Sequence, residues 1–260
     1  MNDFGFDLDF AARPSRLEEP PAGDIPPRRI DGQQDRRPSS CRVNPKSAGV
    51  PPGQGGYCSR VMTSAGMKPG WEAARLLAAA DCCEIEPGLT DAEFRRIEEE
   101  YGFEFADDHR AFLATGLPVR QPPEEGATWA SPWPDWRHGD PAKIREHLEW
   151  PVEGVLQAVE HGYWHPTWRQ RPADSGEALH EAMSMLDRVP KLVPVYAHRF
   201  LPAGHGAHGH PVLSVWGTDI VYYGADLADY INHEFDDFSA HTPDDWNPRA
   251  TVAFWQDFLS

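Results

Sequence analysis

The sequence lacks a long hydrophobic run. Its first apolar stretch, residues 4–10, is interrupted by Asp7 and Asp9. No segment approaches the roughly 20 consecutive apolar residues that a membrane-spanning helix needs, and a secretory signal would also need an uninterrupted apolar core. We therefore expect no signal peptide, no membrane partner and a cytoplasmic protein.

Cysteine is also scarce, with four residues in 260. Cys41 and Cys58 stand apart and Cys82 and Cys83 are adjacent, so the chain has no C-x-x-C pair with zinc-ligand spacing. Adjacent cysteines rarely bridge to each other, and the pattern is typical of reduced proteins. It predicts neither a disulfide framework nor a zinc site.

Motifs of nucleophilic and phosphate-handling enzymes are missing, since the chain contains neither G-x-S-x-G nor a P-loop. Residues 204–209, GHGAHG, match G-x-G-x-x-G, but Pro211 and a strand-like VLSV come next, where a phosphate-binding helix should begin. His205, His208 and His210 share this loop without a carboxylate or cysteine at fixed spacing. We predict no cofactor, no metal and no catalytic residues.

Basic residues are few, with 24 Lys/Arg against 41 Asp/Glu. The first 66 residues hold nine basic and eight acidic residues, which leaves residues 67–260 with 15 basic, 33 acidic and a net charge of −18. Such a field repels nucleic acid and anionic membranes and attracts basic proteins; the alternative is that it only aids solubility. The adjacent aspartates at 107–108, 236–237 and 244–245 are expected from this composition, and we predict that they are solvated.

Residues 1–66 differ from the remainder of the chain. They contain the stretches PAGDIPPRR, DRRPSS and GVPPGQGG, with few apolar clusters. Such a segment can bury too little surface to offset the entropy of ordering it. We predict a disordered tail followed by one domain over residues 67–260. Met62 and Met67 stand at the boundary, which raises the alternative that translation starts there.

The richest strand-forming composition lies within residues 192–238, which we take as the centre of the fold. Three strands are predicted: residues 192–200, 211–216 and 219–223. Only Gly217 and Thr218 separate the last two, which predicts a tight antiparallel hairpin. After Gly224 the spacing becomes helical, with Asp226 as the cap. Strands followed by a helix indicate an α+β fold.

Helical periodicity predicts further elements around these strands: residues 71–81, 91–101, 109–115, 141–148 and 175–189. Thr90 and Glu93 form a capping box before the second of these helices. Asp108 and Asp140 are the expected caps of the third and fourth. Pro151 is expected to stop helical structure shortly after the fourth, because proline interrupts helical hydrogen bonding.

Six of the ten tryptophans lie between residues 129 and 168. Trp150 and Trp164 adjoin predicted elements and are expected in the core. Trp133, Asp135 and Trp136 form a proline-containing, turn-rich stretch, and aromatic segments of this kind either fill irregular core or form a contact surface. We predict that these three residues lie on the surface and bind a protein partner, with the two rings as anchors.

Several segments together resemble the SUKH superfamily, the domain of yeast cell-wall-synthesis regulators and of many bacterial toxin-immunity proteins. The first is LTDAEFRRIEEEYGFEFADDHRAFLATGLPV, with Ala106-Asp107-Asp108 where the family usually has a proline. Similar segments occur after it, in order: WPVEGVLQAVEHGYWHPTW, VPVYAHRFLP, TDIVYYGADLADYINHEF and FWQDFL. The resemblance spans about residues 89–259 and implies an α+β domain, with helices packed on a largely antiparallel sheet, that binds other proteins.

These observations predict a non-enzymatic protein-binding domain. The leading hypothesis is an immunity-type protein that neutralises a bacterial toxin by occlusion, the toxin being a basic, nuclease-like domain. One alternative is a housekeeping regulatory protein of the same family without a toxin partner. Another, from a different class, is an uncharacterised hydrolase or metal-dependent enzyme.

Overall fold

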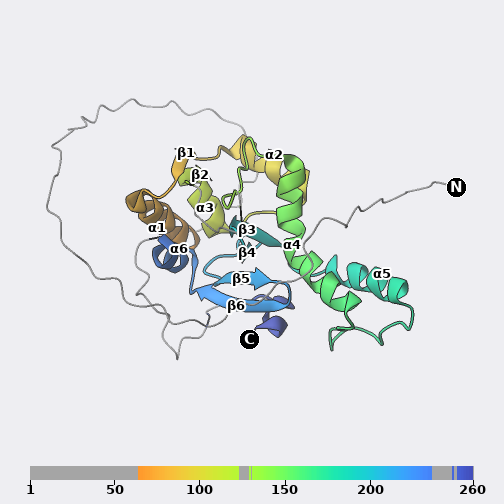
Figure 1. The fold of residues 1–260 in the computed structure, drawn as a ribbon. Helices are drawn as coiled ribbons and strands as arrows, with labels where there is room; N and C mark the ends of the chain where they lie inside the picture. The colour runs from red at the N-terminus through yellow and green to blue at the C-terminus, as the bar shows by residue number, and fades with distance from the viewer. Residues whose placement is uncertain (1–63, 123–128, 130, 236–247, 249–250, 260) are drawn as a thin grey trace, which may run out of the picture. The chain divides into compact units, whose positions relative to one another are not determined.

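The computed structural model describes residues 64–122, 129, 131–235, 248 and 251–259. Helices and antiparallel sheets both occur there, which confirms the predicted α+β class (Figure 1). Nearly all of the predicted tail lies outside this part of the chain. The first helix, α1, spans Ser64–Ala80. The predicted domain boundary at residue 67 and the predicted helix start at residue 71 therefore both fall inside α1.

Four antiparallel strands form the central sheet in the order β3-β4-β5-β6. Their bounds are Leu192–Tyr196, Arg199–Pro202, Val212–Trp216 and Asp219–Gly224. Gly217, with φ of 63°, turns β5 into β6, which confirms the hairpin. The predicted single strand over 192–200 is wrong, because the chain reverses at Ala197 and His198 between β3 and β4. Ala197 adopts φ of 44° there and its N–H donates to the Pro132 carbonyl at 2.7 Å.

Both faces of the central sheet are buried, since alternate residues of β3, β4 and β5 enter different clusters. One cluster takes Val193, Val195, Leu201 and Val212 from the strands. The other takes Leu192, Phe200, Leu213, Val215 and Ile220. The first cluster also contains residues of α1, α2 (Asp91–Tyr101), α3 (Asp107–Thr115) and α6 (Leu227–Phe235).

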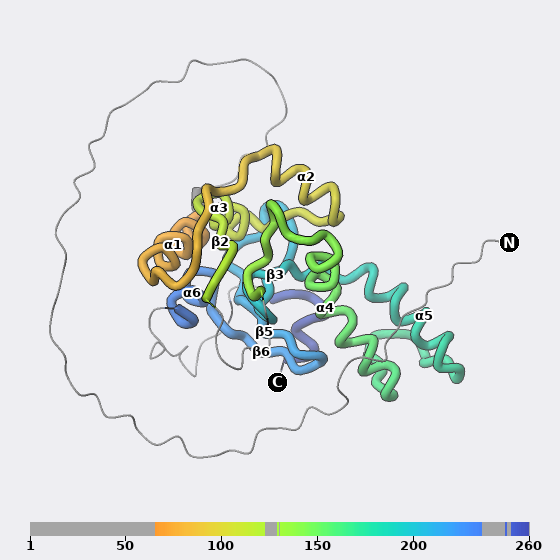
Figure 2. The backbone as a smooth tube through the Cα atoms, turned by 45° about the horizontal axis from the view of Figure 1, so that its top comes forward, coloured from red at the N-terminus to blue at the C-terminus, as the bar shows by residue number. Residues whose placement is uncertain are grey.

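The second cluster is closed by α4 (Pro141–Glu160), α5 (Ser175–Leu186) and the C-terminal residues around the short helix η1 (Trp255–Phe258). Figure 2 shows α4 passing beside the sheet, with α5 beside the C-terminal part of α4. Asp140 caps α4 as predicted, with the Ala142 N–H donating to its carboxylate at 2.9 Å. Pro151 does not stop the helix, however. It is a buried residue inside α4, and the tertiary packing of the helix offsets the roughly 3 kcal/mol that an interior proline costs.

The caps and ends predicted for the other helices agree with the structure in some cases and differ in others. The capping box of Thr90 and Glu93 is present, and Gly102 ends α2 in the left-handed conformation. Asp226 accepts hydrogen bonds from two N–H groups of the first turn of α6. α5 ends at Leu186, three residues before the predicted end. A two-stranded sheet of β1 (Glu84–Pro87) and β2 (Gly116–Arg120) was not predicted.

Candidate functional site

The tryptophans predicted to anchor a partner are interior residues. Trp133 and Trp136 are each 2 % exposed. The Trp133 ring packs on Tyr196 and the Trp136 ring on Phe105, with centroids 4.7 and 5.3 Å apart. Asp135 accepts hydrogen bonds from the backbone N–H groups of Arg137 and His138, at 3.1 and 2.8 Å, and so shapes the turn that contains Trp136.

The prediction that Trp133 and Trp136 lie on the surface is therefore wrong, and the rings that motivated a binding role for this segment are covered. Irregular backbone was the reason for placing them outside, yet an irregular segment can fill a core once its polar groups find partners. Trp150 and Trp164, predicted to be core residues, are only partly buried. The Trp150 indole N–H donates to the Val215 carbonyl at 3.1 Å, which ties α4 to β5.

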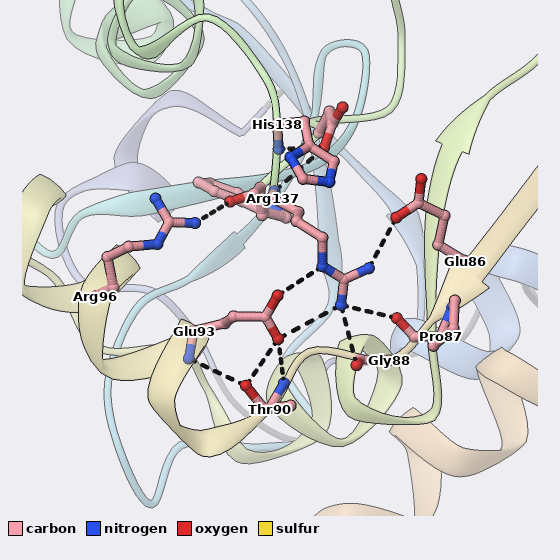
Figure 3. A network of polar contacts seen from close by, with 10 residues as sticks. Glu86, Pro87, Gly88, Thr90, Glu93, Arg96, Arg137 and His138 are labelled. Atoms are coloured by element: carbon pink, nitrogen blue, oxygen red, sulfur yellow. Dashed lines mark hydrogen bonds and ion pairs between the residues drawn. The ribbon is translucent and has the colours of Figure 1, made fainter.

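Arg137 supplies the polar contacts that hold the tryptophan segment in place (Figure 3). Its guanidinium donates to the Glu93 carboxylate at 2.6 Å and to the Glu86 carboxylate at 2.8 Å. A third nitrogen donates to the carbonyls of Pro87 and Gly88, at 3.0 and 3.2 Å. From α2, Arg96 donates to the Trp136 carbonyl at 2.9 Å.

The pKa values in this network indicate a structural role for Glu93 and Arg137. Hydrogen bonding by Arg137, followed by that of Thr90, lowers the pKa of Glu93 to about 2. The same contacts raise the pKa of Arg137. Glu93 is thus a firmly ionised helix cap, and all three nitrogens of the guanidinium are occupied by protein acceptors. A carboxylate and a cation in this state hold structure and transfer no proton near neutral pH.

The aspartates at 107 and 108 are likewise interior, at 3 % and 1 % exposure, so the prediction that this pair is solvated is wrong. Ala106, and not Asp108, is the residue before the first helical position of α3, and it makes no side-chain cap. The pairs at 236–237 and 244–245 lie outside the described residues.

The two buried carboxylates hold the glycine-rich histidine loop, residues 203–211, which joins β4 to β5. Asp107 accepts a hydrogen bond from the Gly206 N–H at 3.0 Å, and Asp108 accepts one from the Gly209 N–H at 2.8 Å. In return the Asp107 N–H donates to the Ala207 carbonyl at 2.8 Å. As predicted, a strand and no helix comes after the loop, so it presents no helix N-terminus to a phosphate.

Burial dominates the ionisation of this cluster. It raises the pKa of Asp108 to about 6, against the opposing effect of the Gly209 and His109 N–H groups. It also lowers the pKa of His109 to about 3 and, with the charge of His208, lowers the pKa of His210. Within the residues that the structure describes, no group of three or more histidine, cysteine or carboxylate side chains could hold a metal ion.

Two other chemically notable groups also have structural surroundings. Burial, with the neighbouring Cys82, raises the pKa of the Cys83 thiol to about 12, so the thiolate needed for nucleophilic attack is scarce. His165, 2 % exposed, lies 3.3 Å from the Asp257 carboxylate and packs against the Phe254 ring. It joins the loop after α4 to the C-terminal segment.

A surface groove of about 460 Å³ lies where the end of α2, the middle of α4 and the segment 186–192 meet. Ten of its fifteen lining residues are apolar or aromatic. Leu148, Val152 and Val189 are the partly exposed aliphatic residues among them. Glu100, Glu149 and Asp187 are the exposed acidic residues of the lining, and Glu100 is paired with Arg96 and Arg145. No motif in the sequence indicates this groove, because its residues come from four separate segments: 100–103, 145–152, 186–192 and residue 255.

The outer face of α4 is acidic. Glu146, Glu149, Glu153 and Glu160 are all exposed, and their spacing of three, four and seven residues places them on one side of the helix. Lys143 pairs with Glu146 at 2.8 Å at one end of this row. The remaining three carboxylates continue along a helix that is 20 residues long. We call these four residues the acidic face of α4.

None of the helices described is both long and apolar enough to cross a membrane. Comparison of the chain with family models, with curated proteins and with solved structures finds no match. The resemblance to the SUKH superfamily therefore stays a prediction from sequence motifs.

Proposed function

We propose that this chain is a cytoplasmic, non-enzymatic protein-binding domain that neutralises a basic partner by covering its working surface. The observation that carries the proposal is the acidic face of α4. Four exposed carboxylates on one side of a 20-residue helix create a local negative potential. A potential of this kind attracts a basic protein over a long range and raises its association rate.

The surroundings of the acidic face add to this proposal. Three groups that an enzyme could use have structural surroundings: the pKa of the Cys83 thiol is raised to about 12, Glu93 is held in hydrogen bonds, and Asp108 is buried. A basic toxin domain suits the immunity-type role that the SUKH resemblance implies. Because the predicted anchors Trp133 and Trp136 are buried, the contact surface is assigned to α4 instead.

The function is tested by capture and then by neutralisation. The full chain, immobilised, is exposed to extract of its native host at low salt, and captured proteins are identified and expressed alone and together with the chain. The expected result is a basic protein that arrests growth alone and not with the chain. Association should slow markedly in about 1 M salt, where the screening length falls to about 3 Å.

A charge-reversed variant tests the role of the acidic face of α4. Glu146, Glu149 and Glu153 are exposed, so changing all three to lysine should leave the melting temperature close to that of the parent chain. The variant should lose neutralisation. If it neutralises as well as the parent chain, or if the captured partner is acidic, the proposed role of the α4 face is wrong.

A further inference from the structure

We infer that the groove between α2, α4 and the segment 186–192 binds an extended, basic segment of the partner, with an arginine or lysine head at Glu149 and Asp187 and an apolar neighbour on the groove floor. This inference rests on the proposed function, because it assigns that function to a defined surface. The groove volume of about 460 Å³ falls within the range typical of ligand sites, roughly 300–1,000 Å³.

The floor of the groove is apolar and is held rigidly. Leu148 and Val152 come from successive turns of α4, and Val189 comes from the segment before β3. Beneath them the buried Trp255 ring is fixed by its indole N–H, which donates to the Pro190 carbonyl at 2.7 Å. Covering partly exposed aliphatic groups with an apolar side chain is favourable, by about 25 cal/mol for each Å² removed from water.

The cations in the lining already have partners within the protein. Lys191 donates to the Gly102 carbonyl at 2.9 Å and so caps the C-terminal end of α2. The Arg145 guanidinium lies 5.2 Å from the centre of the Tyr101 ring and donates to Glu100 at 3.4 Å. These contacts direct both positive charges toward α2.

Unlike these two cations, the carboxylates of Glu149 and Asp187 have no partner within the described part of the protein. Among the described residues, neither the Glu149 nor the Asp187 side chain has an ion-pair or hydrogen-bond partner, and both are exposed. An arginine or lysine suits this combination because its aliphatic stem can cover apolar surface while its charged head reaches the carboxylates. An acidic segment would bring like charges together, and a purely apolar one would leave both carboxylates beside a low-dielectric surface.

Synthetic peptides test the inference independently of the natural partner. The probes are three amidated hexapeptides, namely three Arg-Leu repeats, three Arg-Ser repeats and three Glu-Leu repeats, titrated into the full chain in 0.15 M salt. We expect the Arg-Leu peptide to bind most tightly, the Arg-Ser peptide at least about tenfold more weakly, as about 1.4 kcal/mol of lost apolar contact implies, and the Glu-Leu peptide not at all. The resonance of the Trp255 indole N–H, which donates to the Pro190 carbonyl in the groove lining, should shift during the titration.

Variants separate the groove from the general charge of the domain. Glu149→Lys combined with Asp187→Lys should weaken Arg-Leu binding at least about tenfold. The matched control is Glu146→Lys with Glu160→Lys, which makes the same charge change on the acidic face of α4 outside the groove lining, and it should weaken binding less than about threefold. Melting temperatures confirm that both variants are folded.

Each outcome decides between the two proposals. Equal weakening by the two double variants, an Arg-Ser peptide that binds as tightly as Arg-Leu, or an unmoved Trp255 resonance overturns the groove assignment and leaves the proposed function standing. Peptide binding that behaves as expected, combined with a failure to neutralise any basic protein, supports the groove and overturns the function.

Discussion

Two helices of this acidic chain present carboxylates in opposite ways. In α3, Asp107 and Asp108 point into the protein and accept hydrogen bonds from backbone N–H groups of the histidine loop. In α4, the side chains of Glu149, Glu153 and Glu160 are exposed on one face of the helix. The difference lies in the surroundings of each helix, because glycine-rich backbone supplies N–H donors close to α3.

The comparison shows that charge alone does not mark a binding surface here. The aspartate pair was predicted to be solvated and the two tryptophans to bind a partner, yet all four residues are interior. The carboxylates of the acidic face of α4, and Asp187 beside its groove, are by contrast exposed. The interior and exterior assignments can be tested by comparing matched residues of the same type, beginning with the largest effect.

The largest effect is expected from Trp136→Ala. The ring is buried against Phe103 and Phe105, with centroids 5.9 and 5.3 Å away, so truncation should lower the free energy of unfolding by about 3–5 kcal/mol. The matched control is Trp71→Ala in α1, where the ring is 45 % exposed. Urea denaturation monitored by circular dichroism measures both variants. If Trp136→Ala lowers the free energy of unfolding no more than Trp71→Ala does, the assignment of Trp136 to the core is wrong.

The parts of this arrangement that the sequence predicts are the ones set by near neighbours. The capping box needs only Thr90 and Glu93, and the hairpin needs only a glycine between two β-rich runs. The burial of Trp136 depends on Arg137, whose carboxylate partners Glu86 and Glu93 lie 51 and 44 residues away in sequence. No periodicity within residues 133–138 reports such contacts.

The same reasoning explains the aspartate pair. Gly206 and Gly209, which donate to Asp107 and Asp108, are 99 and 101 residues distant from them in sequence. The sequence did show both halves, a glycine-rich loop and two adjacent carboxylates, but not that the fold places them together. The groove could not be predicted for the same reason, because its lining residues are far apart in sequence.

Pro151 shows the reverse case. Its local preference predicts a helix end, but tertiary packing outweighs that preference and α4 continues through it.

An intermediate effect is expected from pH acting through His147. This ring is 7 % exposed, contacts the Ala197 carbonyl through Nε2, and has a pKa lowered to about 4, chiefly by burial. The unfolded chain takes up the proton near pH 6.5, and the folded chain does so only near pH 4. The stabilisation is therefore complete above pH 6.5 and is lost as pH falls toward 4, by on the order of 3 kcal/mol at about 1.4 kcal/mol per pKa unit.

Urea midpoints between pH 7.5 and 4.5 measure this loss. His147→Gln keeps an N–H donor for the Ala197 carbonyl and removes the titration, so its midpoint should fall less steeply with acid than that of the parent chain. His180→Gln, at an exposed position of α5, is the matched control and should behave like the parent. Identical slopes for the parent and His147→Gln would mean that His147 is solvated in the native state.

The smallest effect is expected at Asp108, where two variants separate the contribution of the hydrogen bonds of the carboxylate from that of its charge. Asp108→Ala removes the acceptor of the Gly209 and His109 N–H groups, at 2.8 and 2.9 Å, and should lower the free energy of unfolding at pH 7.5 by about 1–3 kcal/mol. Asp108→Asn keeps an amide oxygen as acceptor and removes a charge whose burial is unfavourable, so it should cost less than the alanine variant. Urea denaturation at pH 7.5 compares the two.

The pH dependence of the same variants isolates the charge. Burial raises the pKa of Asp108 from 3.8 to about 6, so its contribution to stability is greatest at low pH and decreases as pH rises from 3.8 through about 6, opposite in sign to that of His147. The Asn variant should lack this decrease. The exposed carboxylate Asp187, changed to Asn in the same way, should leave the stability at pH 7.5 unchanged. If Asp108→Asn and Asp108→Ala lose equal stability at pH 7.5, the amide acceptor does not replace the carboxylate, and the histidine loop is held by the charge itself.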